Sequence, residues 1–206
     1  MTYFPFFMDL SSLNGLIVGG GNVALRKLQV LLPYGAELTV AAPSMLPEVT
    51  QLPGLTRLLC YFCPALLEGR DYVIAATGDQ ALNRWIAALC RGRGILVNAV
   101  DDRTACSFLF PALVRRGPLS IGISTGGASP TAAVYCKERI AQLFPEEFGD
   151  LLVYLEGLRD RIKTALPEDT HRGQCFARLF YTCLERGWPL EEAVLADLLA
   201  GGEALS

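Results

Sequence analysis

Histidine is almost absent from this sequence: His171 is the only one among 206 residues. This excludes a His-rich metal site and disfavours a Ser-His-Asp or Cys-His hydrolase. Long apolar runs are also lacking. Of the residues, 51% are hydrophobic. Each apolar stretch is nevertheless interrupted by a glycine, a proline or a charged residue before it reaches the ~18 residues that a membrane-spanning helix needs. We therefore expect a soluble protein with no membrane partner.

Positive charge is scarce as well. The 18 Lys and Arg are outnumbered by 21 Asp and Glu, which gives a formal net charge of −3. With no basic domain and no nucleic-acid-binding motif, we expect no nucleic-acid partner. The first nine residues have no basic segment and reach Asp9 after a short apolar stretch, unlike a secretory signal. The sequence thus favours a cytoplasmic protein.

The seven cysteines are odd in number and irregular in spacing, which favours reduced thiols over a disulfide framework. Cys60 and Cys63 have the spacing of a redox pair, but they end a strand-like run and precede Pro64 instead of opening a helix. A zinc site would need a second close pair, and none is present. We interpret the two as semi-buried thiols and predict no metal ligands.

Short apolar runs alternate with helical patterns in the first half of the chain. We expect strands buried on both faces at residues 15–18, 37–41, 56–60, 72–76 and 95–100. Residues 22–32 suit a helix, and Asp79 can cap another that ends near Gly92. This alternation predicts an α/β fold with a Rossmann-type doubly wound parallel sheet.

The pattern changes in the second half. We expect strands at 108–114 and 119–124 around a turn, and then helices at 130–143, about 147–166, about 170–186 and 189–200. We divide the chain into a nucleotide-binding Rossmann domain (1–112), a small strand-helix element (113–145) and a helical C-terminal domain (146–206).

A glycine-rich loop follows the first predicted strand and opens the first helix. It satisfies the pattern GxGxxG/A with Gly19, Gly20, Gly21, Asn22, Val23 and Ala24. In this context the glycines permit a tight turn and close approach of a pyrophosphate, while the small sixth residue lets the helix pack on the sheet. The unpaired N–H groups of the helix N-terminus favour phosphate. The loop predicts dinucleotide binding.

The second strand is followed by Ala42, Pro43 and Ser44, where NAD-binding domains usually carry an acid for the ribose hydroxyls. An Arg that would favour a 2′-phosphate is also missing. The side chains therefore leave NAD and NADP both open, and backbone groups around Pro43 and Ser44 can hold the adenosine ribose.

Reacting groups in open α/β sheets lie beyond the carboxyl ends of the strands. Thr77 follows the fourth predicted strand, and Asp101 and Asp102 follow the fifth. A carboxylate there can act as a general base near a nicotinamide ring. Alternatively, either aspartate can simply cap the next turn.

A second loop combines glycines and hydroxyls before a helix. It contains Ser124, Thr125, Gly126, Gly127 and Ser129, followed by Pro130. Such a loop can cradle carboxylates or phosphates, or it can be an ordinary Ser-capped turn. The nearby basic residues can attract an anionic substrate or only solvate a face; they are Arg115, Arg116, Lys137 and Arg139.

Taken in order, these motifs resemble the precorrin-2 dehydrogenase family, the dehydrogenase/ferrochelatase part of siroheme synthases. The resemblance covers roughly residues 1–165. It rests on Tyr3-Phe4-Pro5 with Leu10, on residues 18–27 around the glycine loop, on Ile74 to Thr77 with Leu82-Asn83, on Val97 to Asp102, on Ser107 to Ala112 and on Ile123 to Pro130. The ordered set is far more specific than any single motif.

The resemblance implies NAD-dependent oxidation of precorrin-2 to sirohydrochlorin, a step toward siroheme or cobalamin, and in many members insertion of Fe²⁺ or Co²⁺ into sirohydrochlorin. Asp101 matches the family's catalytic aspartate. The other implied site residues are Asn22, Val23, Pro43, Ser44 and Thr77 for NAD, and Ser124, Thr125, Gly126, Gly127, Arg115 and Arg116 for the carboxylates of the tetrapyrrole. The resemblance also implies a homodimer in which 113–145 is the dimerisation element.

Two features depart from the family pattern. Relatives more often carry an arginine-richer helix where this chain has residues 131–137, and the methyltransferase domain of fused siroheme synthases is missing from this sequence. We therefore do not expect this chain to make precorrin-2 itself. The alternatives are a non-catalytic NAD-binding regulatory module, and a dehydrogenase that leaves metal insertion to another protein.

Overall fold

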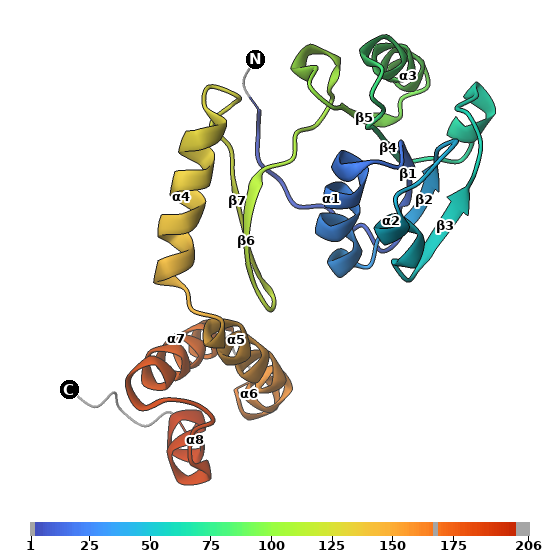
Figure 1. Cartoon of the computed structure of the whole chain (residues 1–206). Coiled ribbons are helices and arrows are strands. Elements are labelled where there is room, and N and C mark those ends of the chain that lie inside the picture. Colours follow the sequence, from blue (N-terminus) through green and yellow to red (C-terminus); the bar gives the residue numbers. More distant parts are fainter. Residues whose placement is uncertain (1–2, 167–168, 201–206) are drawn as a thin grey trace. The chain divides into compact units, whose positions relative to one another are not determined.

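The computed structural model describes residues 3–166 and 169–200 (Figure 1). These residues form two compact units, the first ending at Phe110 and the second beginning at Pro111. Each unit has a buried apolar core of its own. Within the described ranges, no helix is both long enough and apolar enough to cross a membrane. The division into parts at 112 and 145 stays a prediction.

The first unit is built on a parallel sheet. Its strands are β1 (Asn14–Val18), β2 (Glu37–Ala41), β3 (Leu55–Leu58), β4 (Tyr72–Ala75) and β5 (Leu96–Ala99), in the order β3-β2-β1-β4-β5. Val18 pairs with Ala41 on one side and with Ala75 on the other, so neighbouring strands end level with one another. The strand order and direction confirm the predicted doubly wound sheet.

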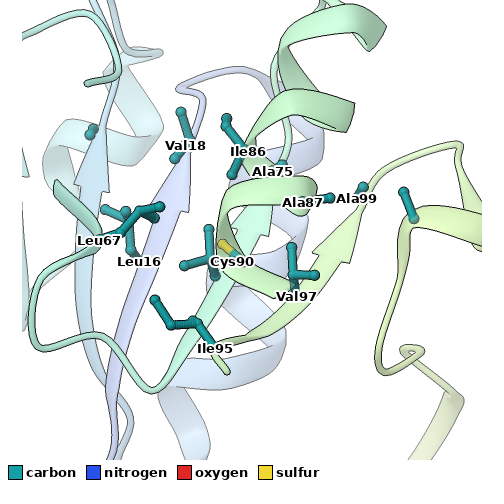
Figure 2. Packing of buried hydrophobic residues seen from close by; sticks show 13 residues of the cluster. Leu16, Val18, Leu67, Ala75, Ile86, Ala87, Cys90, Ile95, Val97 and Ala99 are labelled. Carbon is teal, nitrogen blue, oxygen red and sulfur yellow. The ribbon is translucent and has the colours of Figure 1, made fainter. Parts of the chain in front are cut away.

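Helices cover both faces of this sheet. Ile17 of β1 points to the face that packs against Leu28 of α1 (Asn22–Leu31) and Val49 of α2 (Pro47–Gln51). Leu16 and Val18 point to the opposite face, and Figure 2 shows them with Ile86 and Cys90 of α3 (Gln80–Gly92). Each fully buried aliphatic side chain of this kind contributes about 1.5–3 kcal/mol. Burial on both faces explains why β1, β2 and β4 lack polar alternation. The expectation of burial was wrong for β3, which lies at the end of the strand order and has no buried residue.

The predicted limits of the longer helices in the first unit are confirmed. The carboxylate of Asp79 accepts N–H bonds from Ala81 at 2.8 Å and from Leu82 at 3.1 Å, so it caps α3 as expected. The five-residue helix α2 was not predicted. Its single buried residue, Val49, gives no helical periodicity that could be read from the sequence.

The second unit begins with a hairpin of β6 (Ala112–Arg116) and β7 (Leu119–Ile123), against which α4 (Pro130–Leu143) packs (Figure 1). The prediction that the first of these strands starts at residue 108 was wrong. Ser107 instead donates its N–H to Val97 of β5 at 2.8 Å, and the Asn98 amide donates to the Phe108 carbonyl at 3.0 Å. These bonds keep the segment at the edge of β5.

The second unit continues with the helices α5 (Glu147–Gly157), α6 (Arg159–Ala165), α7 (Asp169–Arg186) and α8 (Glu192–Leu199). Their core contains Ile162, Leu179 and Leu195. The continuous helix predicted over 147–166 is broken at Leu158, directly after the weak helix former Gly157. The last helix starts at Glu192 instead of Pro189, because the Leu190 N–H donates to the Tyr154 hydroxyl at 3.1 Å.

Candidate functional site

Three strands of the first unit, β1, β4 and β5, end at the same edge of the sheet. Hydrogen bonds continue just past the strand ends: the Gly19 N–H donates to Ala41 at 2.9 Å, the Ala76 N–H to Val18 at 2.8 Å, and the Val100 N–H to Ala75 at 3.0 Å. The residues that follow β1, β4 and β5 therefore lie along a common edge. Ligands bind at this edge in open α/β sheets.

Two of the three loop glycines are required by close packing inside the protein. Gly19 has a φ of +128°, and a Cβ there would lie 2.3 Å from the Ala76 carbonyl oxygen. A Cβ on Gly20 would lie 2.4 Å from the Ser44 carbonyl oxygen. The glycine loop therefore packs closely between the segment that follows β4 and the segment that follows β2.

Gly21 differs from both, because a Cβ there would meet nothing within 4 Å. It is the N-cap residue of α1, and no side chain among residues 3–166 and 169–200 caps this helix. The N–H groups of Asn22, Val23 and Ala24 have no partner within the helix. Ala24 itself is fully buried, which lets α1 lie close to the sheet. Open space, free N–H groups and the positive end of a helix fit the pyrophosphate of a dinucleotide.

Pro43 and Ser44 follow β2 and are exposed beside the glycine loop. The loop after β2 is fixed to the glycine loop by the Leu46 N–H, which donates to the Gly20 carbonyl at 2.9 Å. Their position next to Gly20 is compatible with contact to the adenosine part of the same dinucleotide.

Thr77, which follows β4, is held by Asn83 of α3. The Asn83 side-chain oxygen accepts from the Thr77 hydroxyl at 2.7 Å and from its N–H at 3.1 Å, and the Asn83 amide donates to the Thr77 carbonyl at 3.1 Å. Asn83 is 2% exposed. No role for Asn83 was predicted from the sequence, although a buried amide among apolar helix residues indicates a specific hydrogen-bond partner.

The two aspartates after β5 have different environments. Asp102 accepts from the Thr104 hydroxyl at 2.7 Å and from the Ala105 N–H at 3.2 Å, and it pairs with Arg84 at 2.6 Å. The Thr104 hydrogen bond, followed by that of Arg84, lowers the pKa of Asp102 to about 2. Asp102 therefore caps the 3₁₀ turn Arg103–Ala105.

Asp101 is exposed, and its φ is +61°. Throughout residues 3–166 and 169–200 it is the only residue other than glycine with a positive φ. Such a conformation costs of order 1–3 kcal/mol in general, less for Asp than for most residues, and it concentrates at functional sites. Between the two aspartates, Asp101 is the one that structural capping does not explain.

Lys27 is a half-buried cation on α1. Its ammonium nitrogen lies 3.6 Å from the ring centroid of Phe110. Burial, followed by the charge of Arg26, lowers the pKa of Lys27 to about 8. No role for Lys27 was predicted from the sequence, because neither its burial nor its aromatic partner 83 positions away can be read from local sequence.

In the second unit, the loop after β7 is held by its own side chains. The Ser129 hydroxyl accepts from the Ala132 N–H at 3.1 Å and so caps α4. The Thr125 hydroxyl donates to the Ser129 carbonyl at 3.0 Å, and the exposed Ser124 hydroxyl accepts from the Gly126 N–H at 3.1 Å. Gly126 and Gly127 both have positive φ values.

The two arginines of β6 differ in exposure. The Arg116 guanidinium donates to the carbonyls of Phe144 at 2.7 Å and Ala141 at 3.3 Å, and it pairs with Glu146 at 3.0 Å. Arg116 thus provides hydrogen-bond donors for carbonyl groups at the carboxyl end of α4, which have no partner within the helix. Arg115 is the exposed member of the pair.

The cysteines of the CxxC pair and the histidine were considered as metal ligands or redox groups from the sequence. Cys60 and Cys63 are free thiols, one partly buried and the other exposed, and His171 is an exposed residue of α7. Within the part of the chain that the structure describes, no three His, Cys, Asp or Glu side chains group so as to hold a metal ion.

A protein-family model with the description "Putative NAD(P)-binding" matches residues 6–112, just over half of the chain. The chain belongs to this NAD(P)-binding family. A second model, "Sirohaem biosynthesis protein central", matches residues 116–143. Together the two matches confirm the resemblance to siroheme biosynthesis proteins that the ordered motifs indicated.

Curated relatives agree. The siroheme synthase of Chromobacterium violaceum is 40% identical over 95% of this chain, and that of Methylococcus capsulatus is 42% identical over 86%. The chain spans only about two fifths of the length of these relatives, 41% and 38%. Among solved structures, SirC, a precorrin-2 dehydrogenase, shares the fold with a TM-score of 0.76 at 24% identity, over 97% of this chain and 98% of that one.

The open space at Gly21 can be tested as the site of the NAD pyrophosphate. The backbone of Gly21, with φ −91° and ψ −169°, is accessible to alanine, so Gly21→Ala should fold, its cost at the N-cap being largely offset by the lower entropy of the unfolded chain. Its methyl group would occupy the space assigned to the pyrophosphate, and we expect NAD affinity to fall about tenfold or more. Isothermal titration calorimetry measures this. Gly92→Ala, also in open space, is the matched control; equal NAD affinity in both variants would contradict the assignment.

Proposed function

We propose that this chain binds NAD at the glycine loop and oxidises precorrin-2 to sirohydrochlorin. The observation that carries the proposal is Asp101, an exposed aspartate in the left-handed conformation at the end of β5. It lies on the same sheet edge as an uncapped helix N-terminus that fits a dinucleotide. Relatives named siroheme synthase and a structural neighbour named precorrin-2 dehydrogenase support the choice of substrate.

The residues assigned to NAD come from the loops after β1, β2 and β4. The N–H groups at the start of α1 bind the pyrophosphate, and Pro43 and Ser44 bind the adenosine ribose. Thr77, fixed by Asn83, contacts the cofactor from the chain that leaves β4. Bound NAD supplies the hydride acceptor.

Asp101 is the proposed catalytic residue. Oxidation of precorrin-2 to sirohydrochlorin removes two electrons as a hydride and also releases a proton. The exposed carboxylate can accept that proton directly or through one water. Asp102 cannot take this role, because its carboxylate oxygens already accept hydrogen bonds from Thr104, Ala105 and Arg84.

The tetrapyrrole carries many carboxylates, and we assign their binding to the second unit. The proposed contacts are Ser124, Thr125, Gly126, Gly127, Arg115 and Arg116. Arg115 is the exposed arginine of β6 and is the first choice for a direct ion pair, whereas Arg116 contributes through its hold on α4.

An anaerobic assay tests the proposal. Purified protein is given precorrin-2 generated in situ and NAD, and sirohydrochlorin absorbance is followed. We expect product only with NAD and a loss of at least about a hundredfold in rate for Asp101→Asn, which keeps the shape but removes the base. Asp79→Asn, which changes a carboxylate that only caps α3, is the control and should stay active.

The same assay separates the remaining alternatives. A non-catalytic NAD-binding module would bind NAD and leave precorrin-2 unchanged, which would contradict the proposed function. Addition of Fe²⁺ or Co²⁺ after sirohydrochlorin has formed then distinguishes a dehydrogenase from an enzyme that also inserts the metal.

We also propose that the protein is a homodimer joined through the second unit, in the cytoplasm. A two-stranded sheet is marginally stable by itself. In α4 no residue is buried, and Val134 and Tyr135 are 49% and 61% exposed. A helix that exposes large apolar side chains beside a small hairpin fits pairing with a second copy.

The dimer is tested by sedimentation velocity. The chain has a mass of 22.4 kDa, and we expect the wild type to sediment at about twice that value. Val134→Glu should give monomers, because it places a charge in the proposed interface. Val30→Glu, on α1 of the first unit, should remain dimeric. A monomeric wild type would refute the proposal.

A further inference from the structure

Asp101 is the third residue of a tight turn that ends β5. The turn runs from Ala99 to Asp102 and is closed by the Asp102 N–H, which donates to the Ala99 carbonyl at 3.3 Å. A positive φ at the third position is the mark of a type II turn, where glycine is the usual residue. An aspartate adopts this conformation more easily than most residues, but surroundings that hold the turn stabilise it further.

Cys106 contacts both ends of this turn. Its sulfur accepts from the Ala99 N–H at 3.2 Å. The thiol hydrogen can go to the Ala99 carbonyl at 3.2 Å or to the Asp102 carbonyl at 3.3 Å. A single side chain therefore bonds to the residues on either side of Val100 and Asp101.

The position of Cys106 follows from the topology of the sheet. β5 is the last strand in the sheet order, so one side of it has no neighbouring strand in the described part of the chain. Residues 106–108 cover that side: Ser107 exchanges hydrogen bonds with Val97, and the Asn98 amide reaches the Phe108 carbonyl. Among residues 106–108, Cys106 is the one whose hydrogen bonds reach the turn Ala99–Asp102.

The chemistry of the thiol suits a structural bond. Burial raises the pKa of Cys106, which keeps the thiol protonated and able to donate. The same shift makes it a poor nucleophile. Its sulfur is partly covered and already engaged by backbone groups, so it is not a candidate for covalent catalysis.

We propose that Cys106 is a positioning residue that holds the turn Ala99–Asp102, so that Asp101 keeps its left-handed backbone and presents its carboxylate to the substrate. This inference rests on the proposed function of Asp101. It adds that the rate of oxidation depends on a residue that touches neither substrate nor NAD.

The test compares three cysteine variants in the dehydrogenase assay. Cys106→Ala removes the bonds to the turn, and we expect kcat to fall about tenfold or more, because small misplacements of a reacting group are costly. The KM for NAD should stay within about twofold, because the glycine loop is untouched. Cys106→Ser, which keeps a donor and acceptor, should recover most of the rate. Cys90→Ala, a fully buried cysteine of the same core cluster, is the matched control for lost packing.

A double variant tests whether Cys106 acts through Asp101. If it does, Cys106→Ala should slow the Asp101→Asn protein little further, since the group that it positions is already gone. If the two rate losses multiply, or if Cys106→Ala is as active as Cys90→Ala, the inference is overturned.

Hydrogen exchange separates this inference from the proposed function. Cys106→Ala should speed amide exchange at Ala99 and Asp102, whereas Cys90→Ala should not. If the wild type fails to oxidise precorrin-2, the proposed function is wrong, and faster exchange in Cys106→Ala still supports the bond to the turn. Unchanged exchange there overturns it. Should Cys106→Ala not fold, Cys106→Val, which fills the space but can neither donate nor accept a hydrogen bond, is compared with Cys90→Ala in the same way.

Discussion

The site depends on one constraint: parallel strands that end level with one another force the chain to turn away abruptly at a single edge of the sheet. After β1 the turn is made by Gly19, whose Cβ position is filled by the carbonyl of Ala76 from the chain leaving β4. After β5 it is made by Asp101, with a φ of +61°. Glycine adopts the positive φ at position 19 without steric cost, whereas aspartate adopts the positive φ at position 101 at a cost in backbone energy. The difference between these two turns is the strongest argument in the structure for a chemical role.

Hydrogen bonds hold the residues on either side of Asp101 and so offset that cost. Asp102 is bonded to Thr104, Ala105 and Arg84, and Cys106 is bonded to the backbone on both sides of the turn. The helix that starts at the glycine loop, in contrast, is left without a side-chain cap and with open space at Gly21. Rigid support beside an unfilled polar site is the arrangement that preorganised binding and catalysis require.

Much of this could be predicted from the sequence. Continuous apolar runs between helical patterns gave the parallel sheet, and the capping of α3 by Asp79 followed from local chemistry. The glycine loop was recognisable because strand and helix flank it. Other features were out of reach: no pattern encodes the backbone angle that separates Asp101 from its identical neighbour, and the engagement of Arg116 with residues 141–146 depends on tertiary contacts. The late start of β6 likewise reflects side-chain bonds from β5, which local propensity cannot report.

The central claim is that Asp101 keeps an unfavourable backbone for the sake of its carboxylate. The most direct measurement is the stability and dehydrogenase activity of Asp101→Gly beside Asp102→Gly. Glycine at 101 relieves the strain and removes the carboxylate, so we predict stability equal to or above that of the wild type, by up to about 1 kcal/mol, with oxidation of precorrin-2 abolished. Asp102→Gly should be destabilised, because it loses a cap. An Asp101→Gly protein that is as active as the wild type, or as destabilised as Asp102→Gly, would contradict the account.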